Sequence, residues 1–161
     1  MNPLTELAEY EELNRDLNRG KGPVQISGCM DSQKVHLMWE AGETLPWKLV
    51  VTYDDSRAKE IYEDFRCFTD AVWLYPAKDL LFYNADIHGN LITRERMQVL
   101  RHLIEEKSGV VVTTIDGLMD HLLPLSMVES KILTVSQGEV IDIEEWRKRL
   151  VSLGYERMAQ V

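Results

Sequence analysis

Three short, mostly apolar runs place the strongest constraint on how this chain folds. They cover residues 48–53, 71–75 and 109–114. The segments between them, 55–68 and 91–106, carry apolar residues at helical spacing. Apolar strands that alternate with helices are typical of a parallel sheet with helices on both faces. The sequence therefore predicts an α/β fold, and its 161 residues suit one domain, or one domain and part of another.

Further elements are expected around these strands. Residues 4–18 have the spacing of an amphipathic helix, residues 24–27 are typical of a short strand, and residues 35–41 of a helix that Gly42 ends. The remaining expectations are an irregular segment at 77–90, a short helix at 116–123 that Pro124 stops, a strand at 131–136, a turn at 137–139, and a helix at 142–153 that Asp142 caps and Gly154 ends.

A phosphate-binding loop that has lost two of its defining residues is the most informative motif. Such loops read G-x-x-x-x-G-K-[ST], follow a strand and open a helix. Gly28 and Lys34 occupy the first glycine and the lysine, but Gln33 replaces the second glycine and Val35 the hydroxyl residue. A side chain at 33 opposes the backbone conformations that aim N–H groups at phosphate, Val35 cannot hold Mg²⁺, and Asp31 would repel a polyphosphate. We therefore expect a remnant of a phosphate site, Gly28 and Lys34, and no cofactor.

Two other interpretations of this loop stay open. A glycine and a lysine at this separation also occur by chance, and Lys34 is then a surface lysine in a first helical turn. A functional loop would instead make the chain a P-loop enzyme that binds or hydrolyses nucleotides. Gln33, Val35 and the lack of later helicase motifs in the sequence oppose that alternative.

Composition excludes several functional classes. The net charge of −9 and the pI near 4.9 oppose nucleic-acid binding by this chain alone, because phosphate neutralisation supplies most non-specific affinity. The sequence has neither a run of eighteen apolar residues nor a leader pattern, so no membrane partner is expected. Cys29 and Cys67 form no C-x-x-C pair, and we expect reduced thiols in a cytoplasmic protein.

Other candidate chemistry is weak. Cys29 could gain nucleophilicity near a helix N-terminus, but a buried structural thiol is favoured because no histidine is identified beside it. Arg94, Arg96 and Arg101 form the strongest basic cluster, and we expect them to make salt links within the chain rather than phosphate contacts. The histidines lack zinc-binding spacing, so no metal is expected; they are His36, His88, His102 and His121.

Five segments of the chain match one known family in order and spacing. They are 73–79 (WLYPAKD), 93–100 (TRERMQVL), 110–114 (VVVTT), 122–124 (LLP) and 152–161 (SLGYERMAQV). Together they resemble the amino-terminal part of the bacterial transcription-repair coupling factor, over nearly the whole chain from about residue 20. In that family this part is similar to the excision-repair protein UvrB.

The resemblance implies two domains. Residues 1–118 would be a degenerate P-loop domain of the UvrB type, and residues 119–161 the start of an inserted domain that contacts UvrA. The broken loop then has an explanation, because the ATP-driven DNA translocase motor of the family lies in a carboxy-terminal region absent here. The stretch between Pro76 and Leu91 is too short for the aromatic hairpin with which UvrB probes damaged DNA, so lesion probing is not implied.

The resemblance therefore implies a non-catalytic module that recruits UvrA to a polymerase stalled at DNA damage. Arg157, in the segment 154–157, aligns with an arginine that helps contact UvrA. Taken alone, its pattern favours a solvated surface arginine, and only the alignment makes a UvrA contact an equal alternative. We expect weak or incomplete UvrA binding by these residues, contacts with the remaining domains of the full-length chain, and contact with DNA and RNA polymerase only through that full-length protein. A module that packs on its own chain and masks the UvrA site is an alternative.

Overall fold

The computed structural model describes residues 3–78, 86–122, 124–156 and 158. The chain divides into two compact units, Met1–Leu122 and Leu123–Val161, and each is described by itself. None of the helices within the described residues combines the length and the apolar character that crossing a bilayer requires.

The first unit is built on a three-stranded parallel sheet. The strands are β1 (Trp47–Thr52), β2 (Val72–Tyr75) and β3 (Gly109–Thr114), and their spatial order is β1-β3-β2. The central strand β3 is buried from Val110 to Thr114, as expected for a strand with neighbours on both sides. The predicted α/β fold with a parallel sheet is therefore confirmed.

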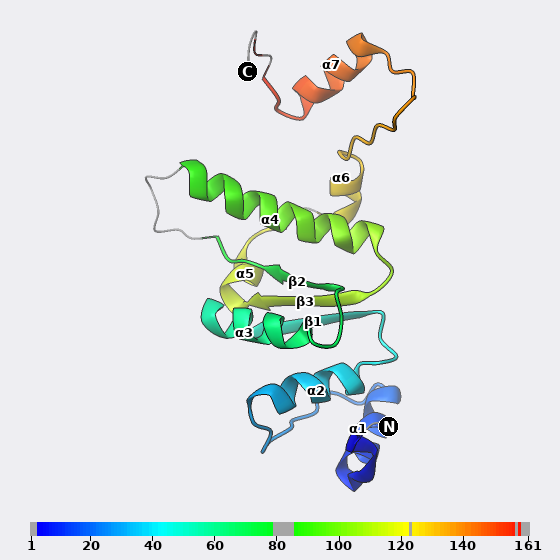
Figure 1. Ribbon diagram of the computed structural model, residues 1–161, viewed down its shortest axis with the longest axis vertical. Coiled ribbons are helices and arrows are strands. Elements are labelled where there is room, and N and C mark those ends of the chain that lie inside the picture. The colour runs from blue at the N-terminus through cyan, green and yellow to red at the C-terminus, as the bar shows by residue number, and fades with distance from the viewer. Residues whose placement is uncertain (1–2, 79–85, 123, 157, 159–161) are drawn as a thin grey trace. The chain divides into compact units, whose positions relative to one another are not determined.

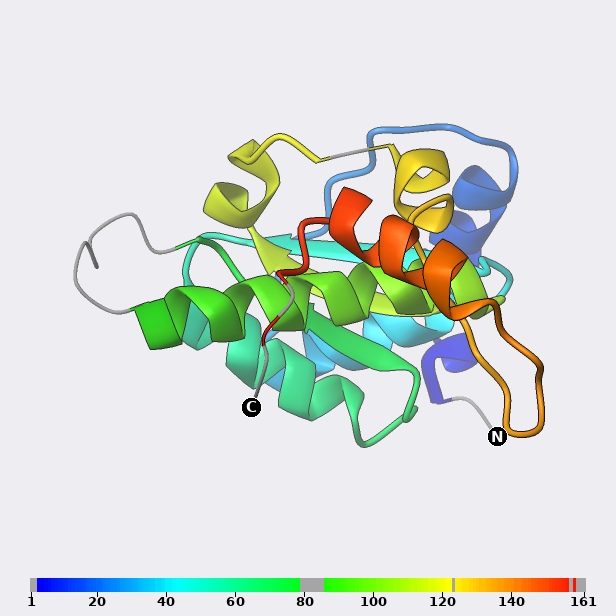
Figure 2. The ribbon, with the colours of Figure 1, turned by 90° about the horizontal axis from the view of Figure 1, so that it is seen from above.

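Helices cover both faces of this sheet (Figure 1). On one face α3 (Asp55–Phe65) packs on all three strands, with α2 (Asp31–Ala41) against α3. On the other face lies α4 (Asp86–Glu105), which runs along the sheet in the view of Figure 2 and contacts β2. The core on the α3 face consists of Val35, Ala58, Ile61, Phe65, Val72, Val110 and Val112, and the core on the α4 face of Tyr75, Val99 and Val111.

Strand β1 is more exposed than its apolar sequence predicts. Leu49 is 59% exposed and Val51 is 43% exposed, although the predicted parallel sheet with helices on both faces would bury this run. The register places Leu49 beside Val111 and Val51 beside Thr113, on the face that α4 covers. Because α4 packs on β2, at the far side of β3, this part of β1 is left open, and the expectation of burial was wrong for it.

Local side-chain bonds explain where several helices begin. The Asp54 carboxylate accepts from the N–H of Arg57 at 2.7 Å and caps α3. The Thr114 hydroxyl accepts from the N–H of Gly117 at 3.1 Å and caps the short helix α5 (Ile115–Met119). Such caps satisfy N–H groups that have no partner inside the helix.

The amino-terminal expectations are partly wrong. Instead of one helix over 4–18, a 3-10 turn (Pro3–Glu6) is followed by α1 (Ala8–Asn18), because Leu7 takes an extended conformation at φ −94° and ψ 122°. Residues 24–27 form no strand, since they pair with no strand among the described residues. A strand requires a neighbouring strand to pair with, and the apolar composition of the run does not show whether one is present.

The segment between β2 and α4 also differs from expectation. Helix α4 begins at Asp86, although residues 77–90 were expected to be irregular. Residues 79–85 of that expected segment lie outside the described residues. Helix α2 likewise starts four residues before the predicted Val35, at Asp31, while its predicted end at Gly42 is confirmed.

The second unit is mostly helical and irregular. Helix α6 (Leu125–Glu129) was not predicted, and residues 131–136 form no strand because no described strand lies beside them. The turn at 137–139 is confirmed, with the Glu139 N–H donating to the Ser136 carbonyl at 3.1 Å.

Helix α7 (Ile143–Ser152) has the predicted ends. The Asp142 carboxylate accepts from the N–H groups of Glu144 and Glu145 at 2.9 and 3.2 Å. Gly154 follows the helix at φ +93°, a left-handed conformation that glycine adopts without steric cost.

Candidate functional site

The remnant of the phosphate loop lines a pocket of about 520 Å³ in the first unit. The loop residues Gly28 and Cys29 and the helix residue Lys34 contribute to it, opposite Thr52 at the end of β1 and Arg57 of α3. Gly28 has φ +88°, so it keeps the backbone freedom that a first loop glycine supplies. The sequence motif and the carboxyl end of a parallel strand therefore meet at one place.

The loop pairs two of its own backbone N–H groups. The N–H of Met30 donates to Oε1 of Gln33 at 3.2 Å, and the N–H of Gln33 donates to the Met30 carbonyl at 2.8 Å. A phosphate cradle needs such N–H groups free and aimed at the ligand. The side chain at the position of the second glycine thus takes a donor that a phosphate oxygen would need.

The residue at the hydroxyl position faces the core. Val35 is 1% exposed and packs in the cluster that contains Ala58, Ile61 and Phe65. A hydroxyl at this position would lie among these apolar side chains and not beside a bound cation. The geometry therefore adds a second obstacle to metal binding, beyond the missing hydroxyl.

The charges around the pocket are partly paired. Arg57 contacts Asp31 at 3.4 Å and Glu60 at 2.7 Å, and the hydrogen bond with Glu60 raises the pKa of the Arg57 guanidinium. Lys34 is exposed and forms no ion pair within the described residues. Around the pocket, the Lys34 ammonium therefore has no ion-pair partner among the described residues, whereas Asp31 and Glu60 neutralise the Arg57 guanidinium.

The basic cluster on α4 behaves as expected for two of its members. Arg101 pairs with Glu105 at 2.8 Å on the helix surface. Arg96 is 5% exposed, and its Nη1 lies 2.9 Å from Oδ2 of Asp120 and donates to the Pro76 carbonyl at 2.9 Å. Arg94 is exposed and has no ion pair in the described part of the chain.

The burial of Arg96 is a feature that sequence reasoning missed. Its guanidinium stands 4.2 Å from the centre of the Tyr75 ring, a cation–π distance. It therefore ties α4 to the end of β2 and to Asp120, just before the chain leaves the first unit. The sequence does show a charged residue on the apolar face of this helix, which is a signal of a buried ion pair. Its partner, Asp120, lies 24 positions further along the sequence and could not be identified from it.

The other predicted site residues give no metal site. Within the described residues, no group of three or more His, Cys, Asp or Glu side chains is placed to hold a metal ion. His102 stacks on Trp73 at 4.7 Å and His36 stacks on Phe68 at 5.7 Å, while His88 has no described side chain. Cys29 is partly exposed rather than buried, so its predicted burial is wrong.

The second unit carries an apolar pocket beside the predicted UvrA-contacting segment. Arg157 itself lies outside the described residues. The pocket, of about 540 Å³, is formed by α7 and its flanks, and Ile143 (74%) and Tyr155 (65%) are strongly exposed there. No residue of α7 is buried, so its apolar side faces this pocket rather than a core.

Comparison with known proteins gives consistent matches. The transcription-repair-coupling factor of Staphylococcus aureus strain USA300 is 27% identical over 166 aligned residues, which cover 100% of this chain and 14% of that protein. The corresponding protein of strain MRSA252 is 26% identical with the same coverage. That of Staphylococcus haemolyticus is 27% identical over 115 residues, 70% of this chain and 10% of the relative.

The chain resembles the amino-terminal region of transcription-repair-coupling factors. The resemblance derived from the five sequence segments is thereby confirmed. The chain spans 14% of the length of the relatives that it matches in full. No family model and no solved structure matches it significantly.

Proposed function

We propose that this chain is a non-catalytic interaction module of a transcription-repair-coupling factor, which recruits UvrA to polymerase stalled at DNA damage. The observation that carries the proposal is the similarity to named transcription-repair-coupling factors along the whole chain. Cytoplasmic location, and contact with DNA and RNA polymerase through a full-length protein, belong to the same proposal.

The proposal divides the chain into a degenerate P-loop domain of the UvrB type, residues 1–118, and the start of an inserted domain, residues 119–161. The parallel sheet and its covering helices support the first part, because all of them lie before residue 118. The apolar pocket on α7 supports a partner-binding role for the second part, because exposed apolar surface of this kind is typical of interaction sites.

The loop geometry supports the absence of nucleotide chemistry. The side chain of Gln33 occupies the Met30 N–H, and Val35 lies in the core. Titration calorimetry with Mg-ATP should show no binding to the 161-residue chain. Micromolar affinity would favour the alternative, a P-loop domain that binds or hydrolyses nucleotides.

Binding to UvrA tests the recruiting role. The 161-residue chain should bind UvrA weakly or not at all, and a protein extended beyond Val161, as the relatives are, should bind clearly in surface-plasmon measurements. In that longer protein, Arg157→Glu should weaken the complex, because a juxtaposed like charge costs several kcal/mol, and salt should weaken it too. Lys148→Glu, an exposed charge reversal on α7, is the matched control.

Comparing UvrA binding by the 161-residue chain and by the extended protein also distinguishes recruitment of UvrA from masking of its site. Equal binding of the extended wild type and its Arg157→Glu variant would leave Arg157 a solvated arginine and move the contact elsewhere. Tighter binding by the shorter chain than by the longer one would favour the autoinhibitory alternative, in which the remaining domains cover the UvrA site.

A further inference from the structure

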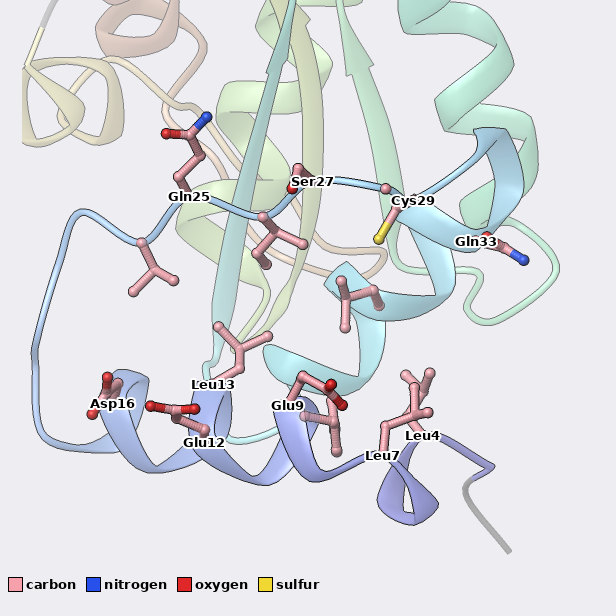
Figure 3. Close-up of a pocket in the computed structure, with 15 residues that line it drawn as sticks. Leu4, Leu7, Glu9, Glu12, Leu13, Asp16, Gln25, Ser27, Cys29 and Gln33 are labelled. Atoms are coloured by element: carbon pink, nitrogen blue, oxygen red, sulfur yellow. The ribbon is translucent and has the colours of Figure 1, made fainter.

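A groove in the first unit has no role in the functions above (Figure 3). It has a volume of about 560 Å³ and lies between α1, the segment 24–29 and α2. Its apolar lining includes Leu7, Val24 and Ile26, which are between 42% and 51% exposed. The size is within the range of about 300–1,000 Å³ of pockets that hold a bound ligand.

One side of the groove is acidic. Glu9, Glu12 and Asp16 lie along the same wall as Leu13 (Figure 3), because residues three and four apart share a helix face. Asp16 is paired with Lys21 at 2.9 Å, whereas Glu9 and Glu12 form no ion pair with any described residue. Among the residues that the structure describes, the lining includes no Lys, Arg or His.

The opposite side of the groove is formed by the backbone of residues 24–27. Residues 24–27 cross the groove outside any helix or strand (Figure 3). Their N–H and C=O groups make no hydrogen bond with any residue that the structure describes. Unpaired backbone of this kind offers the same donors and acceptors as the edge of a sheet.

We propose that this groove docks an extended segment of a partner protein in which apolar residues alternate with lysine or arginine. Its backbone pairs with residues 24–27 as an added strand. Alternate side chains of a strand point to opposite sides, so the apolar ones enter the groove. The lysine or arginine side chains between them point out of the groove, and they are long enough to reach the exposed carboxylates of Glu9 and Glu12 at its acidic side, which have no ion-pair partner among the described residues.

The net charge decides against a second copy of this chain as the occupant. Each copy carries −9, so two copies repel over their whole surfaces, whereas a basic segment is attracted. The same attraction is screened by salt, over about 8 Å at physiological ionic strength. The proposal does not depend on UvrA recruitment.

The test is fluorescence anisotropy of a labelled ten-residue peptide of alternating valine and lysine against the 161-residue chain. We expect saturable binding that weakens with salt and falls about tenfold in Glu9→Lys/Glu12→Lys, since each reversal replaces an attraction with a repulsion. The control pair Glu6→Lys/Glu11→Lys makes the same change of charge at exposed positions outside the groove lining, and should leave affinity within about twofold.

Two further measurements bear on the binding mode. A peptide methylated at every backbone nitrogen keeps its charge but has no N–H group on either edge, and it should bind at least tenfold more weakly. Amide NMR shifts on titration should concentrate at residues 24–27, and circular dichroism should show each variant folded.

Three results would overturn the proposal. Equal weakening by the groove pair and the control pair would mean attraction to net charge only. Unchanged affinity of the methylated peptide would exclude an added strand. Dimerisation in sedimentation velocity that Glu9→Lys/Glu12→Lys abolishes would make a second copy the occupant.

Discussion

Val35→Thr restores the residue type that a phosphate loop uses at this position. We expect it to destabilise the fold without restoring the binding of Mg-ATP. Val35 is 1% exposed and packs with Ala58, Ile61 and Phe65. Threonine has nearly the same shape, so the main change is a hydroxyl buried among apolar groups, which costs about 1–3 kcal/mol. The hydroxyl can bond back to the carbonyl of Asp31, four residues earlier in α2, which places the cost at about 1–2 kcal/mol.

Urea denaturation followed by circular dichroism and tryptophan fluorescence measures this cost. With a slope of about 2 kcal/mol/M, the midpoint should fall by roughly 0.5–1 M. Val51→Thr is the matched control, because Val51 is 43% exposed, and it should change stability by less than about 0.5 kcal/mol. Should Val35→Thr leave the midpoint unchanged, or bind Mg-ATP in calorimetry, position 35 would face the loop and the geometric reasoning would be wrong.

Three further outcomes are expected. Arg96→Met should destabilise the first unit by about 2–4 kcal/mol in urea, because among the described residues it leaves the Pro76 carbonyl unpaired and Asp120 with only Lys78, at 4.0 Å, whereas the exposed Arg101→Met should cost less than about 0.5 kcal/mol. Burial raises the pKa of Tyr75, so the unfolded chain loses this proton first and stability should decline above about pH 10; Tyr75→Phe should flatten that decline in urea titrations between about pH 9 and 11. Asp142→Ala should reduce helical circular dichroism at 222 nm and cost the second unit about 1 kcal/mol, since it removes the cap on Glu144 and Glu145.

The sheet could be predicted from the sequence because each strand has a run of apolar residues with clear ends. The predicted 48–53, 71–75 and 109–114 differ from the observed strands by at most one residue. Their order could not be predicted, since β1-β3-β2 depends on which face each connecting helix crosses. The exposure of Leu49 and Val51 follows from that order, so it was missed as well.

Elements that need a distant partner were the ones predicted wrongly. Residues 24–27 and 131–136 have strand-like composition, but no described strand lies beside either. The burial of Arg96 depends in the same way on Asp120, which is remote in sequence. Helix α7 was predicted well because its cap, Asp142, and its stop, Gly154, act locally.

The residues that depart from a phosphate loop could be recognised in the sequence, but the contacts that these residues make could not. Gln33 and Val35 could be recognised in the sequence as departures from a phosphate loop. That Gln33 bonds the Met30 N–H, and that Val35 belongs to the core, depends on how α2 packs against α3. Arg157 stays a prediction of the resemblance, because it lies outside the described residues.

The open side of β1 has a consequence for how the chain behaves at high concentration. An edge strand with exposed Leu49 and Val51 is a template for pairing between molecules, and among the described residues β1 has a strand on one side only. At neutral pH the net charge of −9 keeps molecules apart. Near the pI of 4.9 that repulsion vanishes, so acidification should turn this edge into the first point of aggregation.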